Sequence, residues 1–334
     1  MIHVHDLQNV KIGKLRCSVA DTDHVPLFFS LVDYRNNLFT SNDPEKIIEF
    51  YDGFDNRDQL IQWMKERPKG ESYIHEVEGD KDIIVVIPTA DFNGKYAKEC
   101  RDNIFKGLHM IFVESGGKDD IYFNYAHNCN VGIKRAMEYN PKWIVLSNDD
   151  MYRIHSIERL KAELMVVNND AISAVFTQKK QYHSVPARIA KQRFVRKLLF
   201  LILDQKVLGK HRLALEKRYS VTLFPATSFD MFGKYFFKSG WNYISIGDFM
   251  ILSAKYVNSL GQSIFDETYV NGYEDDDLSV RLIFEGTKFK RINYEIGDLI
   301  GSTMGKNKSK TRALRDIANA SYFNFKLEIR ETKT

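Results

Sequence analysis

The segment Asp-Ile-Ile-Val-Val-Ile-Pro-Thr, residues 82–89, decides the fold class of this chain. Its unbroken run of β-branched residues predicts a strand that is buried on both faces, as in a parallel sheet. Pro88 marks the end of that strand, because proline has no backbone N–H to donate. Further apolar runs at 108–113, 143–146 and 171–176 alternate with helical stretches. We therefore expect an α/β protein with an open, mostly parallel twisted sheet and helices on both faces.

Polar residues directly follow three of these predicted strands. Thr89 follows the first, Glu114 the second, and the triplet Asn148-Asp149-Asp150 the third. In open α/β sheets, ligands bind beyond the carboxyl ends of the strands. The sequence therefore predicts that these side chains share one site.

A second acidic cluster, Glu274-Asp275-Asp276-Asp277, precedes a helical stretch over residues 278–285. Crowded carboxylates repel one another unless a cation or a shared proton relieves the repulsion. Both acidic clusters are therefore candidate metal or acid/base sites. The alternative is that each is a solvated turn with surface carboxylates, and one of the four acids is expected to cap the helix.

The motifs of the chain occur in a characteristic order, and the C-terminal set is the more specific. They are Val85-Val86-Ile87-Pro88-Thr89, Val113-Glu114-Ser115-Gly116-Gly117, Asn130-Val131-Gly132, Asn148-Asp149-Asp150, Phe265-Asp266-Glu267, Glu274-Asp275-Asp276-Asp277-Leu278, Arg281, Gly286 and Lys288. In this order they resemble the motifs of a family 2 glycosyltransferase, which has the GT-A fold. The resemblance covers about Asp82–Phe176 and Ile246–Thr303.

The resemblance implies an inverting enzyme that moves a sugar from a UDP-, GDP- or dTDP-linked donor to a hydroxyl of a glycan, lipid-linked or protein-linked acceptor. It also implies Mn²⁺ or Mg²⁺, which neutralises the leaving diphosphate and is bound by hard carboxylate oxygens. Asp150 is the first choice of metal ligand, and Asp149 contacts the metal, the sugar or the ribose. Many relatives have a further His ligand, but this chain has no His beyond His211, and Asp298 lies near that position.

The remaining site residues are also assigned by resemblance. Pro88, Thr89, Glu114 and Asn130 would bind the nucleotide, with Glu114 standing where relatives have Asp. Asp275 would be the general base that takes the proton of the acceptor hydroxyl, with Glu274 as the neighbour that could replace it. Arg281 would either pair with the acidic cluster or hold a phosphate.

Two other functions remain open at this point. A nucleotidyltransferase would share the sheet and the metal, although it needs no base at the position of Glu274-Asp275. A catalytically degenerate relative could bind a membrane or a polyanion without reacting, since the usual His is missing.

The expected organisation has an N-terminal accessory region (1–80), a catalytic domain (81–304) and a C-terminal helical tail (305–334). The charged stretch 76–81 indicates the connection between the first two. The catalytic domain would contain a nucleotide-sugar half (81–177), a basic helical insertion (178–218) and an acceptor half (219–304).

The insertion has twelve Lys and Arg side chains against the carboxylates Asp204 and Glu216, whereas the whole chain has a formal net charge of +4. Its apolar residues recur at helical spacing, which is typical of a helix on an anionic membrane surface. The alternative is a helix packed on the catalytic domain with a solvated basic face. Nucleic acid is an unlikely partner, because no recognised binding module accompanies the charge.

The three cysteines, Cys17, Cys100 and Cys129, form neither a metal knuckle nor a disulfide framework. A reducing cytoplasm is the simplest interpretation. The longest strongly apolar run, 198–203, is too short to cross a bilayer core of ~30 Å. We therefore expect a cytoplasmic protein, peripheral at the membrane if residues 178–218 bind lipid.

Overall fold

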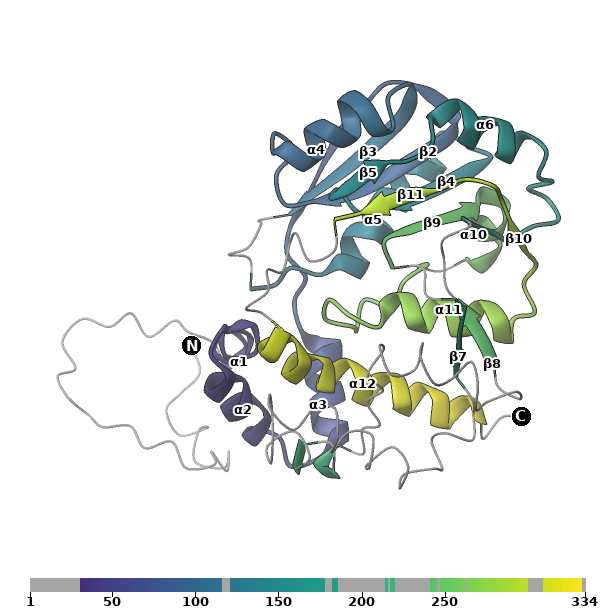
Figure 1. Ribbon diagram of the computed structural model, residues 1–334. Coiled ribbons are helices and arrows are strands. Elements are labelled where there is room, and N and C mark those ends of the chain that lie inside the picture. Colours follow the sequence, from purple (N-terminus) through teal and green to yellow (C-terminus); the bar gives the residue numbers. More distant parts are fainter. Residues whose placement is uncertain are drawn as a thin grey trace.

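A computed structural model shows an α/β sheet above a bundle of helices (Figure 1). It describes residues 31–115, 121–177, 182–185, 214–215, 217–219, 241–244, 247–261, 263–299 and 309–331. The basic helical insertion 178–218 lies almost wholly outside these ranges, so its membrane role stays a prediction. No helix in the described part of the chain is both long enough and apolar enough to cross a membrane.

The central sheet has seven strands within the described residues. In spatial order these are β1 (Ser72–Val77), β3 (Leu108–Ser115), β2 (Asp80–Thr89), β4 (Trp143–Ser147), β9 (Phe249–Ser253), β6 (Ala174–Phe176) and β10 (Phe289–Arg291). Strand β2 is parallel to β3 and β4, and β10 is parallel to β6, whereas β1 and β9 are antiparallel to their neighbours. The predicted α/β class is confirmed, and the sheet is mixed because β1 and β9 oppose the other five strands.

Strand β1 corrects the sequence interpretation of residues 76–81 as a connection. Ser72–Val77 pairs with β3 in register, with Tyr73 opposite Glu114, and β2 begins at Asp80. The central sheet therefore starts before the boundary expected at residue 80. Its first strand is a half-exposed edge with a charged sequence, which explains why no apolar pattern marks it.

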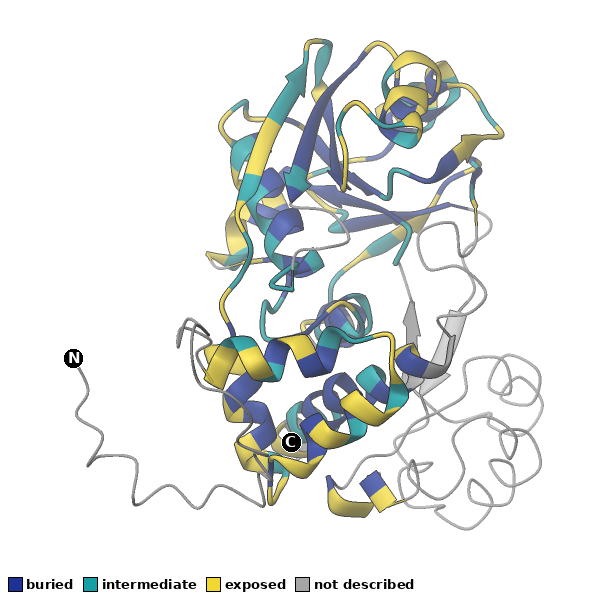
Figure 2. Ribbon diagram, turned by 90° about the vertical axis from the view of Figure 1, so that its left-hand side faces the viewer, coloured by how far each residue is buried: buried dark blue, intermediate teal, exposed yellow. Residues whose placement is uncertain are grey.

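Both faces of the sheet are covered, because the side chains of β2 alternate between two hydrophobic cores. One face packs on α4 (Lys95–Glu99), the π-helix η2 (Cys100–Ile104) and α6 (Ile157–Met165). The other packs on α5 (Tyr125–Met137), α10 (Ala254–Leu260) and α11 (Glu274–Phe284). Figure 2 shows the inner strands as almost wholly buried.

Gly132 lets α5 approach β2 closely. A methyl group there would lie 2.3 Å from Val86 Cγ1 and 2.9 Å from Val113 Cγ2. Gly132→Ala is therefore expected to lower the free energy of unfolding. Overpacking costs about 1–3 kcal/mol, and the higher helix propensity of alanine returns ~1 kcal/mol of this. Urea denaturation measures this loss, with the exposed Lys134→Ala on the same helix as control. A Gly132→Ala protein as stable as the parent would mean that α5 can move away from the sheet.

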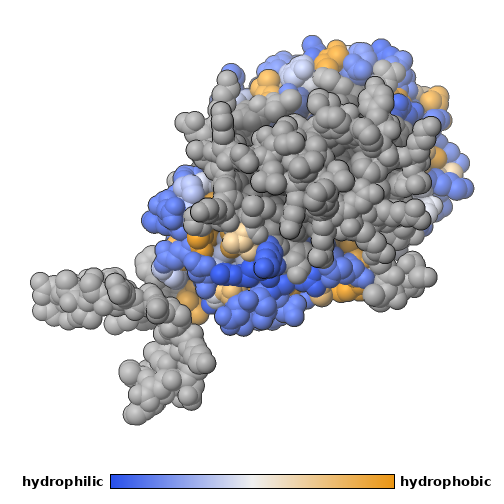
Figure 3. All heavy atoms as spheres, turned by 60° about the horizontal axis from the view of Figure 1, so that its bottom comes forward, coloured by the Kyte–Doolittle hydropathy of each residue, from blue (hydrophilic) through white to orange (hydrophobic). Residues whose placement is uncertain are grey.

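A second core joins the two ends of the described chain. Helices α1 (Leu31–Thr40), α2 (Pro44–Asp52) and α3 (Arg57–Glu66) pack against α12 (Ser309–Glu331) through one hydrophobic cluster. The hydroxyl of Tyr51 donates to Leu314 O at 2.6 Å. On the face of the molecule shown in Figure 3, the described side chains are mainly hydrophilic. This helical unit is anchored to the sheet by α11, because Leu278 packs in the sheet core and Val280 in the helical core.

Two short pairs of strands lie outside the central sheet. Strand β5 (Met151–Arg153) pairs in antiparallel fashion with β11 (Ile296–Asp298). Strand β7 (Tyr182–Val185) pairs with β8 (Trp241–Ile244). The first pair matters for the site, because it starts directly after Asp150.

Candidate functional site

The carboxyl ends of β2 and β4 meet as predicted. Thr89 Oγ1 donates to Asp149 Oδ2 at 2.7 Å, and the Cys100 thiol of η2 donates to Asp149 O at 3.2 Å. Burial is the main cause of the raised pKa of Asp149, and the charge of Asp150 adds to it. Both contacts fix the loop after β4, so the Asp149 carboxylate is held in a poorly solvated position at the sheet edge.

The β5–β11 pair brings the backbone of Asp298 to this corner. Asp298 is the register partner of Met151, and Leu299 N donates to Asp150 O at 2.9 Å. Residues far apart in the sequence are therefore neighbours, with Asp150 only 8 % exposed. Carboxylate oxygens of this kind suit Mg²⁺ or Mn²⁺, which usually take one or two protein carboxylates and complete their shell with phosphates and water.

Glu114 lies beside Thr89, because these two residues are register partners at the ends of β3 and β2. His75 of β1 holds it, with Nε2 at 2.6 Å from Glu114 Oε2. The His75 ring stacks on Phe92, with ring centroids 4.3 Å apart and an angle of 4° between the planes. The sequence did not indicate His75 or Phe92: His75 arrives through the pairing of β1 with β3, and Phe92, in the loop after β2, meets it there.

The four acids at the start of α11 have different surroundings. Glu274 is buried and accepts from Gly272 N at 2.6 Å, so it holds the loop that precedes the helix and does not act as its N-cap. Asp277 is 2 % exposed and lies 2.6 Å from Lys326 Nζ of α12, an ion pair that ties the two helices together. Burial and the charge of Asp275 raise the pKa of Asp276.

Asp275 lies against the backbone at the start of β9. A methyl group at Gly247 would lie 2.5 Å from Asp275 Oδ2. The next residue, Asp248, accepts through its carbonyl from Asn148 N at 3.0 Å. Gly247 and Asp248, at the start of β9, therefore link the acidic cluster of α11 to the Asn148-Asp149-Asp150 loop.

Tyr125, at the first position of α5, also lies between the clusters. Its hydroxyl donates to Asn148 Oδ1 at 3.0 Å. Burial raises its pKa well above the ordinary value, and the charges of Glu274 and Asp275 contribute. An aromatic residue at a helix start is no signal in a sequence, so this contact could not be anticipated.

Burial gives Glu274 a pH-dependent effect on stability. Burial, then the charge of Asp275, raises its pKa to about 8. A carboxyl whose pKa is raised by folding binds its proton more tightly in the folded than in the unfolded chain. Its contribution to stability is therefore lost as the pH rises from the ordinary glutamate value of about 4.3 to about 8.

Glu274→Gln should remove this loss, because the amide does not ionise. We expect the variant to gain unfolding free energy relative to the parent between pH 5 and pH 9, on the order of a few kcal/mol. Chemical denaturation across that pH range measures it, and Glu66→Gln on the exposed face of α3 is the control. Parallel pH curves for parent and Glu274→Gln would contradict the expectation.

Two predicted site residues lie elsewhere. Asn130 Nδ2 donates to Phe265 O and to Glu267 Oε1, at 2.9 Å each, and so clamps α5 to the segment before α11. Arg281 donates through Nη2 to Ile264 O. Neither side chain contacts the Thr89–Asp149 edge.

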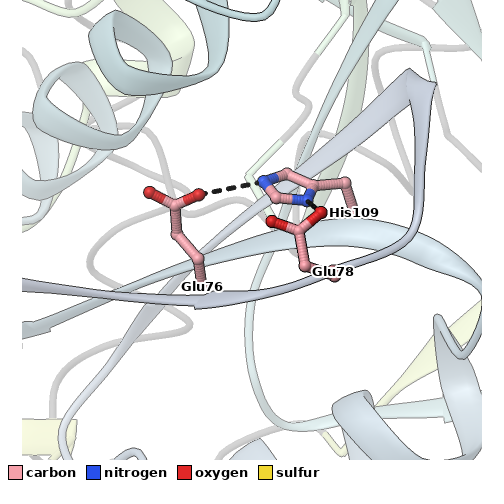
Figure 4. Close-up of side chains that lie close together, drawn as sticks. All are labelled: Glu76, Glu78 and His109. Atoms are coloured by element: carbon pink, nitrogen blue, oxygen red, sulfur yellow. Dashed lines mark hydrogen bonds and ion pairs between the residues drawn. The ribbon is translucent and has the colours of Figure 1, made fainter.

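A Glu-Glu-His group lies at the opposite end of β3 (Figure 4). Glu76, Glu78 and His109 form the one group of described residues whose potential ligand atoms all lie within 4.8 Å of one another. His109 Nε2 lies 3.1 Å from Glu76 Oε2, and His109 Nδ1 lies 3.6 Å from Glu78 Oε2. The chain supplies cations to both carboxylates: Arg135 Nε is 2.6 Å from Glu76 and Lys81 Nζ is 3.1 Å from Glu78. We interpret the group as an ion-pair network that fastens the end of α5 to the sheet edge.

The chain matches no protein-family model, and it matches no curated protein significantly. The chemistry of the site follows from its own residues. Asp149 and Asp150 offer hard oxygen ligands, and Thr89 and Glu114 offer hydrogen-bonding groups beside them. The predicted set Asp149, Asp150 and Asp298, all of them described residues, does not form a group of potential ligand atoms that all lie within 4.8 Å of one another. Asp275 is a carboxylate that lies against Gly247, next to the Asp248 carbonyl that accepts from Asn148 N.

Proposed function

We propose that this chain is a nucleotide-sugar-dependent glycosyltransferase with the GT-A fold. The observation that carries the proposal is the junction of the two acidic clusters, with Asp275 against Gly247 and Asp248 bonded to Asn148. A metal-and-donor site and a base are the two parts that direct sugar transfer to a hydroxyl requires. The order of the sequence motifs supports the same assignment.

The donor would lie across the ends of β2, β3 and β4. Thr89 and Glu114 would bind the nucleoside, and Asp149 and Asp150 would hold the diphosphate end with Asp298 beside them. A divalent ion there, Mn²⁺ or Mg²⁺, would neutralise the leaving diphosphate. The hydrogen bond from Thr89 to Asp149 and the burial of Asp150 would keep this end of the donor oriented.

The acceptor hydroxyl would approach from the side of α11. Asp275 would take its proton as the oxygen attacks the sugar carbon, which inverts the configuration there. Of the four acids, Asp275 is the one whose carboxylate lies against Gly247, next to the Asp248 carbonyl that binds the loop after β4, so it is the acid best placed for this role. Tyr125 would hold Asn148 and the donor loop in register with the base.

The products of a donor screen separate this function from its rivals. Purified protein is incubated with UDP-, GDP- and dTDP-sugars, Mn²⁺ and a mixture of glycan and lipid-linked acceptors. A glycosyltransferase releases nucleoside diphosphate, and the release rises with one acceptor class. In a parallel incubation with nucleoside triphosphates and sugar phosphates, a nucleotidyltransferase would instead transfer the nucleotidyl group to the sugar phosphate and release pyrophosphate from the triphosphate. Binding of a donor without either product would favour the binding-only relative and contradict the proposal.

A further inference from the structure

A polar pocket of about 530 Å³ lies between the helical unit and the sheet. Its walls come from the α3–β1 connection, the segment 263–268, α11 and α12. On α11, Arg281 comes six residues after Asp275, which places it about 240° further round the helix axis. The pocket is therefore on a different side of α11 from the proposed base.

The carboxylates in the wall of this pocket already have donors. Asp266 accepts from Lys326 Nζ and Tyr322 Oη at 2.8 Å each, and its pKa is held at about 2 against the opposing effect of burial, mainly by the charge of Lys326. Glu267 Oε1 accepts from Asn130, and Glu267 Oε2 lies 3.0 Å from His127 Nδ1. Asp266 also accepts from Thr268 N at 3.0 Å, so most of its acceptor sites are in use, whereas Glu267 uses about half of its own.

Two cations in the wall, Lys69 and Arg281, have donor capacity that the described residues leave unused. Within the described part of the chain, Arg281 and Lys69 form no ion pair with a carboxylate. Lys69 Nζ donates to Arg67 O at 3.1 Å, and Arg281 Nη2 donates to Ile264 O. Arg281 Nε is buried without a hydrogen-bond partner. One carbonyl satisfies only part of the donor capacity of a guanidinium or an ammonium group, so the wall has an excess of donors.

We propose that this pocket binds a phosphoryl group through Arg281 and Lys69. A ligand that suits such a wall must be rich in acceptors and negatively charged, because unsatisfied charged donors cost free energy. The flat guanidinium pairs with two oxygens of a phosphate at once, and the lysine adds a point charge. Ser263, also in the wall, provides a hydroxyl donor. The site does not depend on the proposed sugar transfer.

Calorimetric titration of the full chain with orthophosphate and with glycerol 1-phosphate tests the proposal. EDTA is present throughout, so that no metal ion recruits phosphate to the Asp149–Asp150 corner. The parent is expected to bind, and Lys69→Gln and Arg281→Gln should each weaken binding by about tenfold or more, the equivalent of one lost charged hydrogen bond. Lys255→Gln removes the same charge from an exposed side chain that pairs with Asp170 and is not part of the pocket wall, so it should leave binding unchanged.

The two ligands distinguish the source of the phosphoryl group. Tighter binding of the ester indicates a phosphorylated metabolite or glycan, whereas equal or tighter binding of orthophosphate indicates the free ion. If Arg281→Gln fails to fold, Lys69→Gln still decides, because the one described hydrogen bond of Lys69 is to a backbone carbonyl. Absence of binding to the parent, unchanged binding in Lys69→Gln, or an equal loss in Lys255→Gln would overturn the proposal.

Discussion

Asp275→Asn should abolish most sugar transfer while leaving donor binding intact. The amide has the same shape as the carboxylate, so its packing against Gly247 is kept, but it cannot take the proton of the acceptor hydroxyl. Loss of a general base lowers the rate by roughly 10²–10⁴-fold. Steady-state transfer with a saturating donor measures the fall, and calorimetric titration of the nucleoside diphosphate with Mn²⁺ measures donor binding.

Glu274→Gln is the matched control for the base, because it changes the adjacent carboxylate in the same way. Transfer that falls in Glu274→Gln and not in Asp275→Asn would assign the base to Glu274. Transfer that is normal in both variants would contradict the placement of the acceptor at α11.

Asp150→Ala should lose the metal-dependent part of donor binding. Asp150 is the buried carboxylate of the loop after β4, and it lies beside β11, whereas its neighbour Asp149 is only half-buried. We expect the affinity for a nucleoside diphosphate in Mn²⁺ to fall by at least roughly 10–100-fold, the loss that even outer-shell changes at metal sites produce. Activity of the parent should vanish in EDTA and return when Mn²⁺ or Mg²⁺ is added.

Asp170→Asn removes a surface carboxylate and should bind the donor normally, which controls for a general change of charge. Metal-dependent binding that survives in Asp150→Ala would move the metal site away from the loop after β4. The remaining candidates would then be Asp149 and Asp298, each of which can be replaced in turn.

The centre of the fold could be predicted because its strands carry a strong local signal. The β-branched run 83–87 and the apolar runs at 108–113 and 143–146 form β2, β3 and β4. Strand β1 could not be found, because an edge strand that is half exposed has no apolar pattern. The antiparallel insertion of β9 between β4 and β6 is a matter of topology, which local sequence does not encode.

The same distinction applies to the site. Thr89 and Asp149 could be placed together, because the carboxyl ends of neighbouring parallel strands meet at one edge. Glu274, Asp275 and Asp277 could not be told apart, since their different partners come from the loop at Gly272, the start of β9 and α12. His75 and Tyr125 enter the site only through tertiary packing.

Helix α12 sets the order in which the chain can fold during synthesis. Phe39 and Trp63 belong to the same core as Ile317, so α1–α3 can pack on one another but cannot complete the burial of their apolar faces until α12 has left the ribosome. By then every described strand of the central sheet has been made. The first helices synthesised are therefore among the last to be completed, and they need protection from aggregation in the interval. Nascent chains stalled before residue 309 should show protease cleavage within residues 31–66, and protection there would contradict this order.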